Sequence, residues 1–161
     1  MRTLIVYYSL EGNTAHVAEQ LARALGAETL RLEPEKEYPS SGMKKFLWGG
    51  KSAVMGEEPA LKPYAFRGED WDRIIIGFPV WAGSVSPPIR TFVRDHGGEL
   101  AGKSIAAFAC QSGSGAEKAF KKLAALLGRE SLEAELALID PKAKPDPKNE
   151  EKLEDFCREL R

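Results

Sequence analysis

The sequence predicts a three-layer, doubly wound α/β fold built on a five-stranded parallel sheet with the strand order 2-1-3-4-5. Three continuous apolar runs, 4–8, 72–78 and 104–110, are typical of strands that helices cover on both faces. Two other segments, 29–32 and 132–138, alternate polar and apolar residues, as edge strands do. Helical patterns separate the five segments, so we expect right-handed crossovers between parallel strands. Alternating strands at the edges and continuous strands in the centre give the order 2-1-3-4-5.

Length and composition favour one ordinary domain spanning residues 1–161. The chain has 43% hydrophobic residues and a net charge of −1, so neither disorder nor a nucleic-acid partner is indicated. No apolar run is long enough to insert into a membrane, and the chain enters its first strand without a signal-peptide pattern, so we expect a cytoplasmic protein. Cys110 and Cys157 are too few for a disulfide framework and have no metal-ligand spacing with His16 or His96.

The first strand leads directly into a helix. Apolar residues recur at helical spacing from about Thr14 to Leu25, and Gly26 stands where a glycine commonly ends a helix. The short strand 29–32 follows and ends before Pro34.

Residues 33–70 are the least regular part of the sequence. A helical stripe from Met43 to Val54 predicts an imperfect helix that is weak at Gly49 and Gly50. Trp48 lies off this stripe and either packs on the surface or covers a ligand, with the surface position favoured.

Three further helices are predicted in the second half. The first starts after Ser86 at Pro87-Pro88 and is expected to close at His96 and Gly97-Gly98. The second is expected over 115–127, with Gly128 ending it. A linker over 141–148 leads to the last helix, whose apolar face contains Leu153, Phe156, Cys157 and Leu160.

The predicted strand order places a ligand crevice between strands one and three, at their carboxyl ends. The loop 9–14 opens a helix there, and a helix start with hydroxyls, an amide and a glycine suits a phosphate. The alternative is a plain turn in which Asn13 or Thr14 caps the helix.

Two more loops meet the same crevice. The loop 79–86 contains Trp81 beside Gly83, which together could stack on a flat ring and hydrogen-bond its edge. The loop 111–115 adds small polar groups on the other side. The alternatives are that Trp81 anchors the core and that the Gly-Ser run is only a turn.

These loops resemble the flavin-binding loops of the flavodoxin family. The resemblance rests on the segments 9–14, 79–84 with Pro87-Pro88, and 111–115, and it spans nearly the whole chain. It implies a flavodoxin-like fold and one non-covalently bound FMN. By this resemblance Ser9, Gly12, Asn13 and Thr14 hold the phosphate, residues 79–84 line one side of the isoalloxazine, and residues 111–115 touch its pyrimidine edge. The implied cofactor-binding residues are Ser9, Leu10, Glu11, Gly12, Asn13, Thr14, Pro79, Val80, Trp81, Ala82, Gly83, Ser84, Gln111, Ser112, Gly113, Ser114 and Gly115.

The sequence departs from the family pattern in two places. Glu11 stands where the family usually has a hydroxyl residue, and a carboxylate near a phosphate is unfavourable unless it turns toward solvent. The second loop lacks the tyrosine that many flavodoxins stack on the outer ring face, so that face is open or covered by Trp48.

Rival sites fit the residues less well. A dinucleotide site needs three spaced glycines after strand one, where only Gly12 is present. The segment 49–52 is similar to a phosphate loop but lacks its first glycine and a preceding strand. A receiver domain is expected to have acidic residues where 7–9 reads Tyr-Tyr-Ser. Neither His16 nor His96 is placed beside a nucleophile, so each is interpreted as a solvated or capping residue.

The resemblance predicts an FMN redox protein and leaves its electron donor and acceptor undecided. An electron carrier that serves a redox partner protein is favoured over an NAD(P)H-dependent reductase that acts on a small acceptor such as a quinone. Familiar flavodoxins are strongly acidic, whereas this chain is near neutral with Lys44, Lys45 and Lys51 close to Trp48, which weakens the carrier interpretation. A non-enzymatic flavin sensor or storage module is a third possibility. No catalytic residue and no metal site are expected, and the sequence leaves the oligomeric state open.

Overall fold

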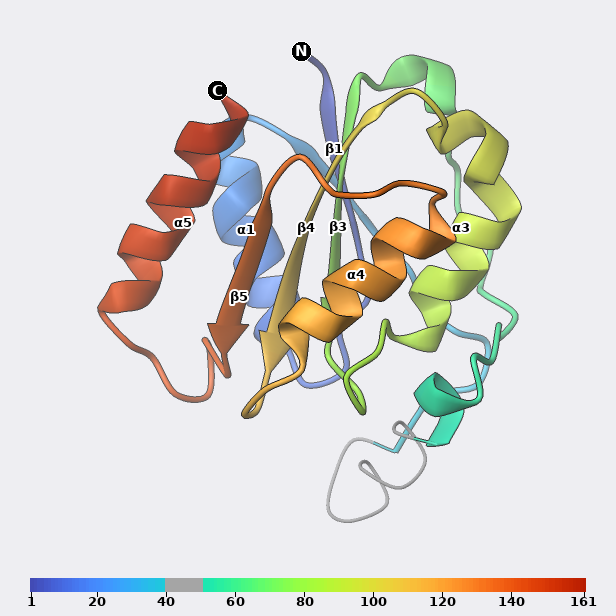
Figure 1. Ribbon diagram of the computed structural model, residues 1–161, viewed down its shortest axis with the longest axis horizontal. Coiled ribbons are helices and arrows are strands. Elements are labelled where there is room, and N and C mark those ends of the chain that lie inside the picture. Colours follow the sequence, from blue (N-terminus) through green and yellow to red (C-terminus); the bar gives the residue numbers. More distant parts are fainter. Residues whose placement is uncertain (40–50) are drawn as a thin grey trace.

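A five-stranded parallel sheet forms the centre of the computed structural model, which describes residues 1–39 and 51–161 (Figure 1). The strand order is β2-β1-β3-β4-β5, and every neighbouring pair is parallel. The strands are β1 (Thr3–Tyr7), β2 (Glu28–Arg31), β3 (Arg73–Pro79), β4 (Ser104–Gln111) and β5 (Glu135–Ile139). The predicted fold class, strand order and edge positions of the two alternating strands are therefore confirmed.

Helices cover both faces of the sheet. Helices α1 (Asn13–Leu25) and α5 (Lys148–Leu160) pack on one face, and α3 (Pro87–Leu100) and α4 (Ala116–Leu126) pack on the other (Figure 1). A short 3₁₀ helix, η1 (Gly68–Asp70), precedes β3, and residues 51–54 are helical. Among the described residues, no helix is long and apolar enough to cross a membrane.

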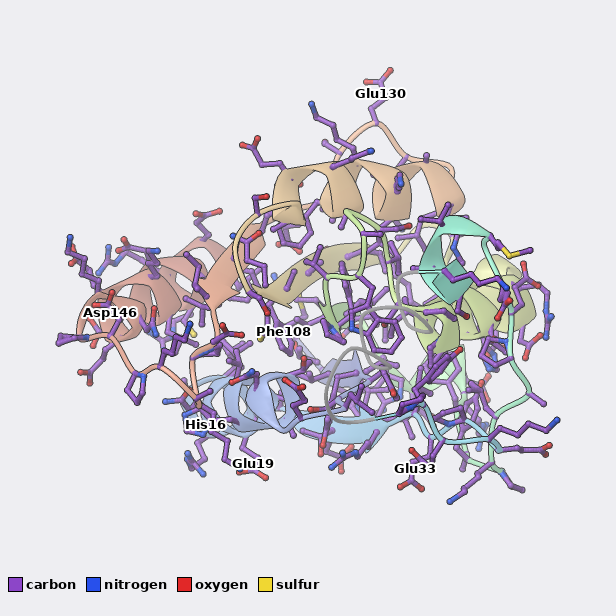
Figure 2. All side chains as sticks on the ribbon, turned by 90° about the horizontal axis from the view of Figure 1, so that it is seen from below. His16, Glu19, Glu33, Phe108, Glu130 and Asp146 are labelled. Atoms are coloured by element: carbon purple, nitrogen blue, oxygen red, sulfur yellow. The ribbon has the colours of Figure 1, made fainter. Side chains whose placement is uncertain are left out.

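Strand β1 shows why the central strands contain continuous apolar runs. Leu4 and Val6 belong to the core under α3 and α4, whereas Ile5 and Tyr7 belong to the core under α1 and α5. Successive side chains of a strand point to opposite faces, so a strand with two covered faces is apolar at consecutive positions, with polar residues such as Thr3 at its end. In Figure 2, Phe108 of β4 lies in the interior while Glu33 and Glu130 project outward.

Helix α3 ends later than predicted. It continues through Gly97 and Gly98 to Leu100, which is buried, and the N–H of Ala101 still donates to the carbonyl of Gly97. Neither glycine has the positive φ with which glycines end helices, because burial of Leu100 holds the last turn in place.

His96 is neither a cap nor a solvated side chain. Its Nε2 lies 2.8 Å from the Tyr64 hydroxyl and its Nδ1 lies 2.8 Å from Glu99, and its ring packs against Phe66 and Phe92. Glu99 also accepts the backbone N–H of Gly68. The hydrogen bond from His96 and, to a smaller extent, the one from Gly68 lower the pKa of the Glu99 carboxyl. His96 therefore links α3 to the segment before β3.

Part of the predicted irregular region lies outside the described residues. The helical stripe from Met43, its weak point at Gly49-Gly50 and the positions of Trp48, Lys44 and Lys45 fall there or depend on it. Both alternatives for Trp48, the favoured surface position and the position that covers a ligand, therefore stay predictions. On the described side, the carbonyl of Glu33 accepts the N–H of Lys62, so residues 33–35 and 60–62 run together.

Two glycines give a matched test of this packing. A Cβ atom on Gly77 would overlap the ring of Phe108, its partner across β3 and β4, whereas a Cβ on Gly97 meets nothing within 4 Å. Because the Phe108 ring is buried on all sides, we expect Gly77→Ala to lower the free energy of unfolding by about 1–3 kcal/mol. We expect Gly97→Ala, on an open helix face, to raise it by about 0.5–1 kcal/mol. Urea unfolding of the two variants measures both, and a neutral Gly77→Ala would contradict the packing described.

Candidate functional site

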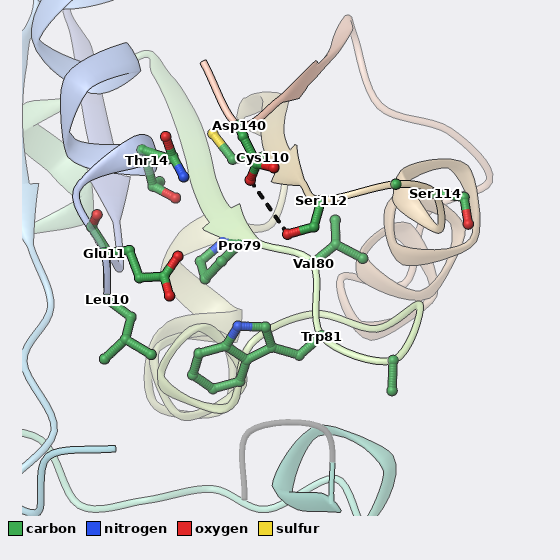
Figure 3. A pocket seen from close by; sticks show the side chains of 14 residues that line it. Leu10, Glu11, Thr14, Pro79, Val80, Trp81, Cys110, Ser112, Ser114 and Asp140 are labelled. Carbon is green, nitrogen blue, oxygen red and sulfur yellow. Dashed lines mark hydrogen bonds between the residues drawn. The ribbon is translucent and has the colours of Figure 1, made fainter. Parts of the chain in front are cut away.

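The three predicted loops converge on one cavity of about 190 Å³ at the carboxyl ends of β1, β3 and β4 (Figure 3). Its lining combines hydroxyls, two carboxylates, a thiol and apolar side chains. The lining residues are Ser9, Leu10, Glu11, Asn13, Thr14, Pro79, Val80, Trp81, Ala82, Cys110, Ser112, Gly113, Ser114 and Asp140. All of them except Cys110 and Asp140 are among the residues predicted to bind a cofactor.

Five predicted residues shape the loops without lining the cavity. The three glycines adopt left-handed backbone conformations, and Ser84 and Gln111 form hydrogen bonds that hold the turns. The Oε1 of Gln111 accepts the N–H of Ala116 at 3.0 Å and so caps the start of α4. The five residues are Gly12, Gly83, Ser84, Gln111 and Gly115.

The loop 9–14 leaves the start of α1 open toward the cavity. Gly12, with φ of +98°, turns the chain into the helix, and its carbonyl accepts the N–H of His16 at 3.0 Å. The Ser9 hydroxyl accepts the N–H of Ala15 at 3.1 Å. The N–H groups of Asn13 and Thr14 precede any carbonyl acceptor within the helix, so they are available to an anion in the cavity.

The Asn13 side chain does not cap α1. Its Oδ1 accepts the backbone N–H groups of Lys142 at 2.9 Å and Ala143 at 3.2 Å. It therefore fastens the loop after β5 to the loop after β1. The helix-capping alternative for Asn13 is wrong, because the backbone of a distant segment uses the oxygen that would have capped the helix.

The loop after β3 makes a tight turn at Trp81. Trp81 and Ser84 exchange two backbone hydrogen bonds, of 3.0 Å and 3.3 Å, around Ala82 and Gly83. Both intervening residues have positive φ, 51° for Ala82 and 66° for Gly83. A left-handed alanine costs about 1–2 kcal/mol, so the mouth of the cavity contains a strained residue.

Trp81 packs in the core and also lines the cavity. It is 8% exposed, and its ring meets those of Tyr8 and Tyr38 edge-on at centroid distances of 5.8 Å and 5.1 Å. Figure 3 shows the indole along one side of the opening that Leu10, Glu11 and Pro79 also border. The two sequence alternatives for Trp81, core anchor and ligand wall, are thus compatible.

Tyr38 is a supporting residue that the sequence analysis missed. Its hydroxyl lies 3.1 Å from the Ser52 hydroxyl, which donates to Glu57 at 2.6 Å. This chain of hydrogen bonds connects residues 51–57 to the aromatic cluster around Trp81. Tyr38 lies in the irregular segment, where no periodicity signals a position.

Asp140 is a lining residue that the sequence analysis also missed. It follows β5 directly, has φ of 37°, and its Oδ1 accepts the Ser112 hydroxyl at 3.3 Å (Figure 3). Its position at the carboxyl end of a parallel strand could have indicated a site residue. The sequence analysis missed it because β5 is an edge strand and the crevice was predicted between strands one and three.

Comparison with known proteins agrees with this geometry. A family model described as flavodoxin matches residues 2–144. The chain belongs to the flavodoxin family.

Solved structures similar to this flavodoxin-family chain share its fold over nearly the full length. A protein described as a flavoprotein from Bacteroides uniformis is 25% identical with a TM-score of 0.77, and the match covers 97% of both chains. A similarly described protein from Bacteroides eggerthii is 25% identical with a TM-score of 0.73, covering 97% of this chain and 98% of that one. A flavoprotein from Lactobacillus acidophilus, solved in complex with FMN, is 19% identical with a TM-score of 0.74, covering 97% and 98%.

The charges around the cavity of this flavodoxin-family protein are mixed. Glu11 and Asp140 contribute carboxylates to the lining, and the Arg31 guanidinium donates to the Ser9 carbonyl at 3.1 Å from outside it. Burial raises the pKa of the Cys110 thiol to about 12, an effect that a hydrogen bond from Thr14 partly offsets. Cys110 is therefore a protonated thiol near neutral pH, not a nucleophile.

Gly115 holds two of the loops together. Its φ is +106°, and a Cβ there would lie 3.0 Å from the Cα of Gly83 and 3.2 Å from Cγ1 of Val80, whereas a Cβ on Gly113 meets nothing within 4 Å. We expect Gly115→Ala to lower the free energy of unfolding by about 1–3 kcal/mol through backbone strain and displacement of the 79–84 turn. Gly113→Ala is the matched control and should change it by less than about 0.5 kcal/mol. Chemical denaturation of the two variants measures the change. Equal effects of Gly115→Ala and Gly113→Ala would contradict the close approach of Gly115 to the 79–84 turn.

Proposed function

We propose that this chain binds one FMN non-covalently in the cavity and acts as an electron-transfer flavoprotein. The observation that carries the proposal is the convergence of three loops, with an open helix start at one end and a fixed indole ring at the other. Membership of the flavodoxin family and the FMN complex of the Lactobacillus acidophilus flavoprotein support the choice of ligand. When bound, the flavin would supply the redox chemistry.

The residues present fit the parts of FMN. The N–H groups of Asn13 and Thr14, with the hydroxyl of Ser9, would receive the phosphate at the positive end of α1. Trp81 and Pro79 would border the ring system, whose polar edge would meet the exposed backbone of residues 112–114. Two backbone hydrogen bonds between Trp81 and Ser84 hold the turn on that side of the cavity.

Titration with FMN and riboflavin tests the ligand. We expect FMN to bind at least tenfold more tightly than riboflavin, because charge-assisted hydrogen bonds to the phosphate are each worth about 1.5–3 kcal/mol. Ser9→Ala should reduce that preference, since the Ser9 hydroxyl is one of the groups proposed to receive the phosphate, whereas the exposed Thr29→Val on β2 should not. Equal affinity for the two flavins would remove the case for a phosphate site at residues 9–14.

The role is proposed as an electron carrier between partner proteins, with an NAD(P)H-dependent reductase as the second candidate. Among the described residues, the cavity lining contains apolar groups, hydroxyls, carboxylates and a protonated thiol, with no lysine or histidine to exchange protons with a substrate. This lining suits a protein that holds its cofactor and passes electrons. The net charge of −1 favours the second candidate, because it gives little steering toward a basic partner protein.

Anaerobic stopped-flow mixing of the holoprotein with NADH and NADPH separates the two roles. We expect the absorbance of the oxidised flavin to bleach more slowly than about 1 s⁻¹ with either nucleotide, below the usual range of enzyme turnover. Rapid bleaching by one of them would reject the pure carrier and establish a reductase. A protein that binds no flavin at all would reject both roles.

A further inference from the structure

Lys142 approaches the start of α1 from the far end of the chain. A Cβ atom on Gly12 would lie 3.2 Å from Nζ of Lys142, 3.5 Å from its Cδ and 3.9 Å from its Cε. The ammonium group therefore lies against the backbone that opens the helix, next to the proposed phosphate site. The Lys142 side chain is exposed, and neither it nor Gly12 lines the cavity. Lys142 follows β5, and no feature of its sequence neighbourhood indicates this position.

The backbone of Lys142 is fixed by two loops of the cavity. Asn13 accepts its N–H at 2.9 Å and that of Ala143 at 3.2 Å. On the other side, the Asp140 carboxylate accepts the Ser112 hydroxyl at 3.3 Å, and the Asp140 carbonyl accepts the N–H of Lys144 at 2.7 Å. The lysine is thus held by structure that belongs to the cavity itself.

The carboxylates of the cavity lining are relevant to the position of the Lys142 ammonium. Glu11 and Asp140 place negative charge in the lining, which opposes the binding of a phosphate. Lys144 lies 4.0 Å from the Asp140 carboxylate, whereas no carboxylate within the described ranges 1–39 and 51–161 forms an ion pair with Lys142. The Lys142 ammonium is therefore positioned to act on an anion bound at the start of α1.

We propose that Lys142 is a phosphate-binding residue that sets the preference of this protein for a phosphorylated flavin over an unphosphorylated one. Its ammonium offsets the carboxylates of the lining and acts together with the N–H groups of Asn13 and Thr14. Gly12 is required by its φ of +98°, and its missing side chain leaves room for the lysine beside the backbone. This inference rests on the proposed FMN binding and assigns a specificity-determining residue within it.

The test compares two exposed lysines of the segment that follows β5. Dissociation constants for FMN and riboflavin are measured for the wild type, Lys142→Gln, Lys142→Arg and the control Lys148→Gln, at low and high salt. We expect the ratio of riboflavin to FMN dissociation constants to fall about fivefold or more in Lys142→Gln, with riboflavin affinity unchanged. Lys142→Arg should retain most of the ratio, and Lys148→Gln should change it by less than about twofold. The salt dependence of FMN binding should weaken only in Lys142→Gln.

The outcomes separate the inference from the function on which it rests. If the wild type prefers FMN and Lys142→Gln keeps the full preference, the role of Lys142 is overturned while FMN binding stands. If Lys142→Gln weakens FMN and riboflavin equally, the residue supports the loop and does not recognise phosphate, which also overturns the inference. If the wild type binds neither flavin, the proposed function and the inference fall together.

Discussion

The site depends on the opposite directions in which the chain leaves β1 and β3. Helix α1 carries the chain from β1 to β2 on one face of the sheet, and α3 carries it from β3 to β4 on the other. The loops that follow the two neighbouring strands therefore separate, and a crevice opens between them at the carboxyl edge. The apolar burial that covers both faces holds this arrangement, and the polar residues of the site add little to it.

The cavity combines a rigid aromatic side with an electrostatically mixed polar side. Trp81 is fixed by two edge-on aromatic contacts and by the tight turn that follows it. On the polar side, two carboxylates lie near a helix start whose partial charge is positive. One added or removed charge near this helix start therefore changes the electrostatic free energy of binding an anion.

Contacts between distant segments complete the site. Asn13 joins the first loop to the segment after β5, Gly115 joins the third loop to the second, and Tyr38 joins residues 51–57 to the indole. These residues lie at the start of a helix or in a loop, outside the strands of the sheet. The cavity is therefore shaped by residues that do not line it as well as by those that do.

The sequence by itself determined the strand and helix order, the edge positions of β2 and β5 and the three loops at the crevice. These features follow from hydrophobic periodicity and from glycine, proline and cap residues, which act over a few positions of the chain. The tertiary structure alone decided that α3 passes through Gly97-Gly98, that His96 links two segments, and that Asp140 enters the cavity with Lys142 beside it. Each of these depends on contacts between segments far apart in the chain. No local pattern encodes such contacts, because they form only when the sheet brings its carboxyl ends together.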